Sequence, residues 1–301
     1  MNAAQTYETQ RLGALRIFVG TLLLVRTTPL LYLVPGLREH HGGPLFGWPD
    51  GELHIGLAGV TLPVFAVQVL VVLRTIAVVL FLAGVFARAA GLAAAVLGYV
   101  VWSQEPFSFI FTLHTLYLTT ALLALGDAVS ARALLPARVR SPGSSVALMR
   151  AFILSIYAWS AVAKLHHRWL DGSVLRTLRD AHYLSGPIVE HLLRSEAGLR
   201  AAAWGTPLLE AAVVPLLVFR RTRPMGIVIA CILHATFEVS LHPDVFGVLM
   251  VGLLVVFWPR PAHLPAIEEQ KSPPSSRTWT QSQWKTSTPN EHSPASHGPA
   301  P

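Results

Sequence analysis

The sequence predicts an all-α, polytopic membrane protein: a transmembrane helix bundle of about eight membrane helices, with short amphipathic outer helices and a disordered C-terminal tail. Of the 301 residues, 52% are apolar and 13% are charged, and the mean hydropathy is +0.51. Soluble domains carry about 25% charged residues. Apolar runs of near-membrane length also recur along the chain. We therefore expect a multi-pass protein of the cell membrane with the lipid bilayer as its surroundings.

Hydropathy places the membrane helices roughly at residues 12–34, 63–87, 89–104, 107–126, 147–165, 205–219, 225–241 and 245–258. Several runs are shorter than the ~20 residues of a perpendicular span, so some must be tilted or partial. The first run follows Arg11 without a small-residue cleavage site and is predicted to be an uncleaved signal anchor. We expect residues 1–260 to form one transmembrane domain. Residues 261–301, rich in Pro, Ser and Thr, are expected to be a disordered cytoplasmic tail.

Arginine placement predicts that both termini are cytoplasmic. With the N-terminus inside, the inner loops hold most of the arginines, whereas outer loops one, two and four hold only Arg38. The long outer segment, 166–204, carries five arginines, but long loops cross the membrane largely regardless of charge. The same pattern explains the pI of about 10.1 without a nucleic-acid site.

The outer segment 166–204 shows apolar residues at helical spacing. Leu175 and Leu178 form one group and 188–193 a second, with Pro187 placed as a first-turn residue. We predict two short amphipathic helices that cover the outer ends of the spanning helices. They are either a lid over a site or solvated connectors.

Four ionisable residues lie in the outer half of the predicted bundle: His114, Lys164, Glu210 and His234. Each such group costs ~2.5 to 3.5 kcal/mol on insertion and is therefore a functional candidate. At ~1.5 Å per residue, their depths agree within one or two helical turns, which predicts a shared cavity open to the outside. The alternatives are structural: the lysine reaches the interface, the histidines are neutral core groups, and the glutamate forms an ion pair.

Lys164 is the only lysine before Lys271, whereas arginine occurs nineteen times in the same span. A desolvated lysine can become a neutral amine and act as a base, which arginine cannot do. The solitary lysine therefore favours a general base over a fixed positive charge.

No metal site is predicted. His40, His41 and His54 lie in the first outer loop, but no cysteine or close carboxylate pair completes a ligand set. We leave these histidines unassigned. The single cysteine, Cys231, excludes an intrachain disulfide.

Three stretches carry a resemblance to a known family: YAWSAVAKLHHRWLDG, LHTLYLTTALLALGDAVSARAL and FRRTRPMGIVIACILHATF. They resemble, in order and spacing, the polar motifs of the horizontally transferred transmembrane domain (HTTM) family, which includes vitamin K-dependent gamma-carboxylase. The similarity covers roughly residues 10 to 260. It identifies residues 1–260 as an HTTM-like transmembrane domain.

The resemblance implies roles for five residues. Lys164 falls where the carboxylase has the base that deprotonates vitamin K hydroquinone, and His114 and His234 fall on histidines that border the same cavity. These three are the candidate catalytic residues. Glu210 falls near an acidic position, and Trp169 belongs to the aromatic stretch after the lysine; both are candidate contacts to a quinol cofactor.

Two functions stay open. The first is a gamma-carboxylase-like or quinol-oxidising enzyme with a lysine base acting on a quinol or lipid-borne substrate in an outward-facing cavity. The second is a non-enzymatic membrane component that binds a partner protein or an exported peptide. One departure from the family is Leu113, where the carboxylase has Asn. Contact between Glu210 and Lys164 would hold the proton on the lysine and oppose a base.

Overall fold

The computed structural model describes residues 3–27, 52–54, 61–102, 111–126, 133–134, 142–184, 186–240 and 245–258. Apart from turns, these residues are helical except for one small antiparallel sheet, in which β1 (Glu52–His54) pairs with β2 (Thr61–Pro63) so that Glu52 lies opposite Pro63. The all-α prediction is confirmed. The predictions for the tail 261–301 and for His40 and His41 lie outside the described residues.

A helix occupies each of the eight positions expected from hydropathy. They are α1 (Ala3–Thr27), α3 (Val64–Ala83), α4 (Ala87–Trp102), α5 (Phe111–Leu125), α6 (Pro142–Ala163), α10 (Glu196–Val218), α11 (Arg223–Ser240) and α12 (Phe246–Leu253), which the 3-10 turn η3 (Leu254–Phe257) continues. Among the described helices, four are long and apolar enough to cross a membrane: α3, α6, α10 and α11. Shorter apolar helices span 87–102, 111–125 and 246–257. Eight spans are therefore not confirmed, although the membrane character is.

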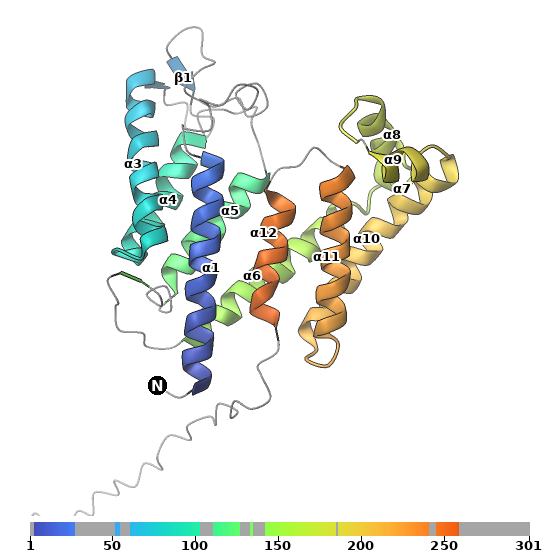
Figure 1. Cartoon of the computed structure of the whole chain (residues 1–301). Helices are drawn as coiled ribbons and strands as arrows, with labels where there is room; N and C mark the ends of the chain where they lie inside the picture. The colour runs from blue at the N-terminus through green and yellow to red at the C-terminus, as the bar shows by residue number, and fades with distance from the viewer. Residues whose placement is uncertain are drawn as a thin grey trace, which may run out of the picture.

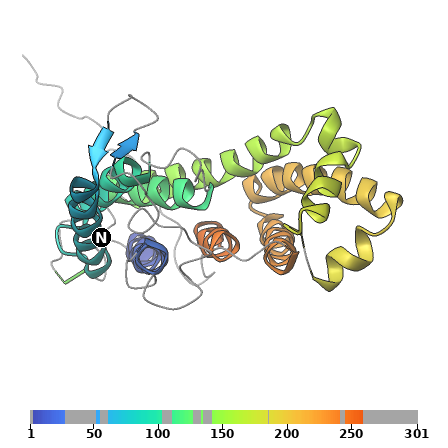
Figure 2. The same ribbon diagram turned by 90° about the horizontal axis from the view of Figure 1, so that it is seen from above.

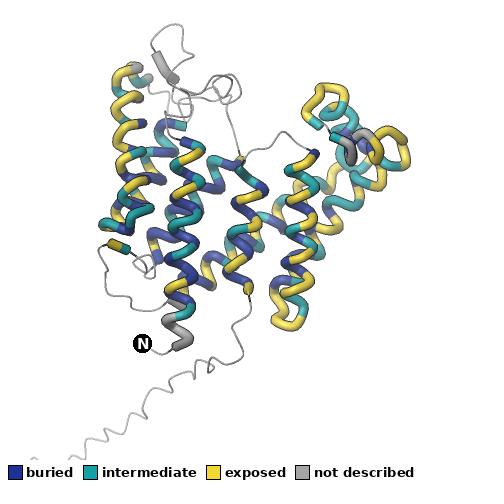
Figure 3. The backbone as a smooth tube through the Cα atoms, viewed as in Figure 1, coloured by how far each residue is buried: buried dark blue, intermediate teal, exposed yellow. Residues whose placement is uncertain are grey.

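The helices form two rows. Seen from above, α1, α12 and α11 stand side by side, with α5, α6 and α10 behind them and α3 and α4 at one end (Figure 2). Apolar side chains such as Phe65, Trp159 and Ile232 are exposed, as expected for surfaces that face lipid. Exposed positions recur along the helices of the bundle (Figure 3). Small residues allow close packing inside: a Cβ added to Gly98 on α4 would clash with the ring of Tyr117 on α5.

The outer segment folds into three short helices: α7 (His167–Leu170), α8 (Ser173–Asp180) and α9 (Pro187–Leu192). They lie at the end of the bundle away from the N-terminus (Figure 1). The predicted pair corresponds to α8 and α9, and Pro187 is in the first turn of α9 as expected. We call α7, α8 and α9 together the outer helices.

The predicted start of the sixth span at residue 205 was wrong. Helix α10 begins at Glu196, so residues 196–204 belong to the helix and not to a connector. The physical reason is a local cap: Ser195 has an extended backbone, and its hydroxyl oxygen accepts the backbone N–H of Gly198 at 3.0 Å. The added turns make α10 long enough to span a membrane.

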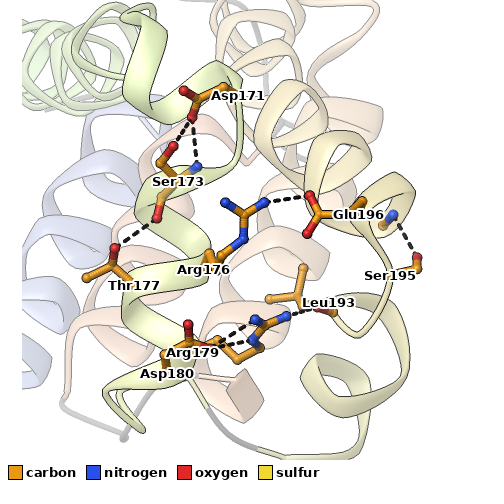
Figure 4. Close-up of polar contacts among 10 residues, drawn as sticks. Asp171, Ser173, Arg176, Thr177, Arg179, Asp180, Leu193, Ser195 and Glu196 are labelled. Atoms are coloured by element: carbon orange, nitrogen blue, oxygen red, sulfur yellow. Dashed lines mark hydrogen bonds and ion pairs between the residues drawn. The ribbon is translucent and has the colours of Figure 1, made fainter.

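The outer helices pack on the first half of α10 around a small core of their own. This core consists of Leu175, Val189, Leu193, Leu199 and Ala203. Polar contacts surround it, as Figure 4 shows: Arg176 pairs with Glu196, and Arg179 pairs with Asp180 while its Nη1 donates to the Leu193 carbonyl at 2.7 Å. The outer helices are therefore joined to α10 by both apolar and charged contacts.

Candidate functional site

A cavity of 460 Å³ lies between α6, α10 and α11, beneath the outer helices. This volume is within the ~300 to 1,000 Å³ of small-molecule sites. Most of its wall is apolar, with leucine and valine side chains from α8 and α9 on one side and aromatic rings from α5, α11 and α12 on another. The polar side chains on the wall include Tyr157, Ser160, Lys164, Glu210, His234 and Glu238.

Helix α6 supplies three of these polar groups from one face. Tyr157, Ser160 and Lys164 are separated by three and four residues, the spacing that brings side chains above one another on a helix. Lys164 directly follows the last residue of α6, and its backbone N–H bonds to the Ala161 carbonyl at 3.1 Å. The lysine therefore leaves the helix end with its side chain against the cavity.

Lys164 forms an ion pair with Glu210 of α10. Its Nζ lies 2.9 Å from both Oε1 and Oε2 of the glutamate. The Glu210 side chain is only 4% exposed and that of Lys164 is 17% exposed. A buried carboxylate requires such a partner, because an unpaired charge at that depth is strongly unfavourable. The ion pair therefore provides the buried carboxylate with its counter-charge.

Ser160 bonds to both members of the ion pair. Its hydroxyl donates to Glu210 Oε1 at 3.0 Å and accepts a hydrogen bond from Lys164 Nζ, which also donates to the Ser160 carbonyl at 3.2 Å. The three side chains therefore form a closed network. Sequence reasoning did not single out Ser160, although its position one helical turn before Lys164 was readable.

Trp169 of α7 faces the lysine. Its ring centroid lies 5.4 Å from Lys164 Nζ, within the range of a cation–π contact. The indole N–H donates to the Ala203 carbonyl on α10 at 3.0 Å, which fixes the ring. The predicted contact residue thus lines the cavity next to the ion pair.

A second polar pair on the wall consists of Tyr157 and His234. The tyrosine hydroxyl lies 2.8 Å from His234 Nε2, and the His234 residue is 3% exposed. The other ring nitrogen, Nδ1, is buried and has no hydrogen-bond partner among the residues that the structure describes. Either tautomer leaves this nitrogen unsatisfied, as an N–H without an acceptor or as an acceptor without a donor. Tyr157 was also missed as a site residue in the sequence.

His114 does not join the other three predicted residues. Lys164, Glu210 and His234 all line the cavity, whereas His114 is absent from its wall. Its Nδ1 lies 3.0 Å from the hydroxyl of Tyr99 on α4. The predicted depth in the membrane was similar for all four residues. His114, however, lies on the side of α5 that faces α4.

Asp171, which lies between α7 and α8, accepts two hydrogen bonds that affect its pKa. The Ser173 hydroxyl and backbone N–H both donate to Asp171 Oδ1, the latter at 2.8 Å (Figure 4). Hydrogen bonds to the charged form lower the pKa of this carboxyl below its ordinary value. Among the described residues, no group of three His, Cys, Asp or Glu side chains is arranged to hold a metal ion.

Comparisons with known proteins gave one match, to a family model. No curated protein and no solved structure matches the chain. A family model described as the HTTM domain matches residues 107–261, just over half of the chain. The match includes α5, α6, the outer helices, α10, α11 and α12, and so every helix that supplies a wall of the cavity. The chain is a membrane protein that belongs to the HTTM domain family.

Proposed function

We propose that this protein binds a quinol or a similar lipid-borne hydroxyl compound in its cavity, and that Lys164, coupled to Glu210, removes a proton from the bound hydroxyl. The observation that carries the proposal is the buried Lys164–Glu210 ion pair on the wall of a largely apolar cavity. Perturbed or paired ionisable groups in such a cavity mark functional sites. We further propose that the cavity faces outward, with both termini cytoplasmic.

The lining supports a ligand with an aromatic ring and an apolar chain. Aromatic side chains, among them Phe111, Trp169 and Phe246, share the wall with leucines of the outer helices. Two polar pairs, Lys164 with Glu210 and Tyr157 with His234, offer hydrogen-bonding groups at two separate places on the wall. The buried, unpartnered Nδ1 of His234 provides a further reason to expect a polar ligand group.

The resting ion pair must rearrange before the lysine can act as a base. The proton moves from Lys164 Nζ to a carboxylate oxygen of Glu210, which leaves a neutral amine and a neutral acid. In a dry cavity the neutral pair competes with the charged pair, because burial disfavours both charges. The amine then accepts the proton of the bound hydroxyl. The two residues thus gain one proton as a unit.

The new negative charge on the substrate oxygen faces the re-formed ammonium of Lys164, which stabilises it. The Trp169 ring and the outer helices keep water away from this oxygen. A quinol supplies an acidic hydroxyl and, once ionised, reducing power. Carboxylation of a further substrate, which the family resemblance implies, also needs molecular oxygen, which oxidises the ionised quinol and so generates a stronger base, and carbon dioxide as the group that is added.

The test is anaerobic binding of a hydroquinone with a short isoprenoid chain, followed by the absorbance of its ionised form. Wild-type protein is expected to bind it and ionise a substantial fraction. The Lys164→Arg variant should bind it without ionising it, because guanidinium stays protonated. Lys271→Arg is the matched control. Full ionisation by the Lys164→Arg variant would rule out a lysine base.

A second candidate function, binding of a partner protein or exported peptide without catalysis, is favoured by exposed apolar side chains of the outer segment. Tyr183 is 63% exposed and Leu192 is 49% exposed. Exposed apolar groups near a membrane surface are common contact points. Under this function, Lys164→Ala leaves activity in the cell intact, whereas Tyr183→Ala and Leu192→Ala abolish it. Recovery of a quinone from the purified protein by lipid extraction and mass spectrometry would favour the first function.

A further inference from the structure

We infer that Ser160 is a positioning residue of the Lys164–Glu210 pair, and that its hydroxyl holds the pair together in both of its protonation states. The inference rests on the proposed function and deepens it. It starts from the fact that Ser160 contacts both charged groups at once.

The ammonium of Lys164 has three N–H donors and no acceptor. Its partners are the two oxygens of Glu210, the Ser160 hydroxyl and the Ser160 carbonyl. All three donors therefore have acceptors, and two of the four partner atoms belong to one serine. A substrate hydroxyl that approaches Nζ must replace one of these bonds.

The Ser160 hydroxyl is suited to such a replacement because it can both donate and accept. At rest it accepts from Lys164 and donates to Glu210 Oε1, so it stabilises the charged form at both ends. When the proton moves to Glu210, rotation about one C–O bond lets the same hydroxyl donate to the neutral amine. A backbone carbonyl, which only accepts, cannot reverse its role in this way.

Helix geometry explains why a serine at this position performs the task. Residue 160 lies one turn before Lys164 on α6, so its side chain and carbonyl are both directed along the face where the lysine amine lies. Threonine places a hydroxyl at the same site. Alanine keeps the helix but removes the one hydroxyl that, among the described residues, bonds to both charges.

The test compares Ser160→Ala and Ser160→Thr with Ser155→Ala as control. Ser155 is an exposed serine on the same helix, and its hydroxyl donates to the Phe152 carbonyl at 2.7 Å. Ser160→Ala should slow hydroquinone ionisation about tenfold with little change in its binding constant, as expected for the loss of one hydrogen bond to a charged group. Ser160→Thr should restore the rate, and Ser155→Ala should leave it unchanged.

A second readout does not depend on activity. In full-length protein carrying Lys271→Arg and Lys285→Arg, Lys164 is the only lysine, so its reductive methylation by formaldehyde and cyanoborohydride can be followed by mass spectrometry of the peptide that contains it, apart from labelling of the N-terminal amine. Ser160→Ala should label about tenfold faster than wild type because the amine is held less firmly, and Ser160→Thr should not. If wild-type protein fails to ionise the hydroquinone, the proposed function is wrong and the labelling rates still decide the role of Ser160. Equal labelling rates in Ser160→Ala and wild type would overturn the inference.

Discussion

Lys164→Ala is expected to lower the free energy of unfolding by about 3 to 5 kcal/mol, the cost of removing one partner from a buried ion pair. The Glu210 side chain is 4% exposed, so its carboxylate cannot reach water when the ammonium is lost. Only the Ser160 hydroxyl would still donate to it among the contacts of the described residues. For a protein of this size the loss corresponds to a fall in melting temperature on the order of 10 °C.

The reverse change should cost less. In Glu210→Gln the amide still accepts a hydrogen bond, and Lys164, with 17% of its side chain exposed, can turn toward the interface. The double variant Lys164→Met, Glu210→Leu should recover most of the stability, because a well-packed apolar pair replaces a desolvated ionic one with little net cost.

Thermal unfolding in lipid nanodiscs, followed by tryptophan fluorescence, measures all three variants at one pH. The expected order of melting temperature is wild type, double variant, Glu210→Gln and Lys164→Ala. Ser155→Ala, on the exposed face of α6, serves as the control and should melt with wild type. The reasoning would be refuted if Lys164→Ala melted within about 2 °C of wild type, or if the double variant melted below Lys164→Ala.

Three further changes test other contacts. Tyr157→Phe leaves the buried Nε2 of His234 without a partner and should cost about 1 to 3 kcal/mol, measured by the same unfolding experiment. Asp171 has a lowered pKa in the folded protein, so its stabilising effect is complete above the ordinary carboxyl pKa and is lost as the pH falls through the pKa of the folded state. Hydrogen exchange of the α8 amides should therefore become faster as the pH falls through this range, relative to the unfolded-peptide rate at each pH. Ser173→Ala should make this pH dependence smaller, because it removes one of the two hydrogen bonds to the carboxylate. Gly186→Ala places a side chain at φ +95°, a strained conformation, and should increase proteolysis of the outer helices.

The helices of the bundle could be predicted because long apolar runs have few alternatives in a membrane. Their ends could not. The residues 196–204 include Glu196 and Arg200, whose charges lower the mean hydropathy, although a Ser195 cap starts the helix there. Hydropathy averaged over a window of residues falls where charged residues occur, so it places the helix start too late. The actual start depends on the backbone conformation and hydrogen bond of a single residue, Ser195.

The site shows a different limit of sequence reasoning. Position along a helix predicts depth in the membrane, which is why Lys164, Glu210 and His234 were expected to lie at similar levels. Position along a helix does not predict which neighbouring helix a given side chain faces. His114 has a comparable predicted depth but lies against Tyr99 on α4. Only the packing of α4 on α5 decides that direction.

Under the proposed function, the contact between Lys164 and Glu210 makes the pair, and not the lysine alone, the base. A lysine alone would have to be neutral at rest, which burial could achieve. With the carboxylate at 2.9 Å and Ser160 bonded to both, the proposed proton-accepting unit is the pair as a whole. Activity should therefore depend on Glu210 as strongly as on Lys164: Glu210→Gln, which keeps the shape but cannot take the lysine proton, should bind hydroquinone and fail to ionise it. If Glu210→Gln ionised it as well as wild type, the lysine would have to act alone.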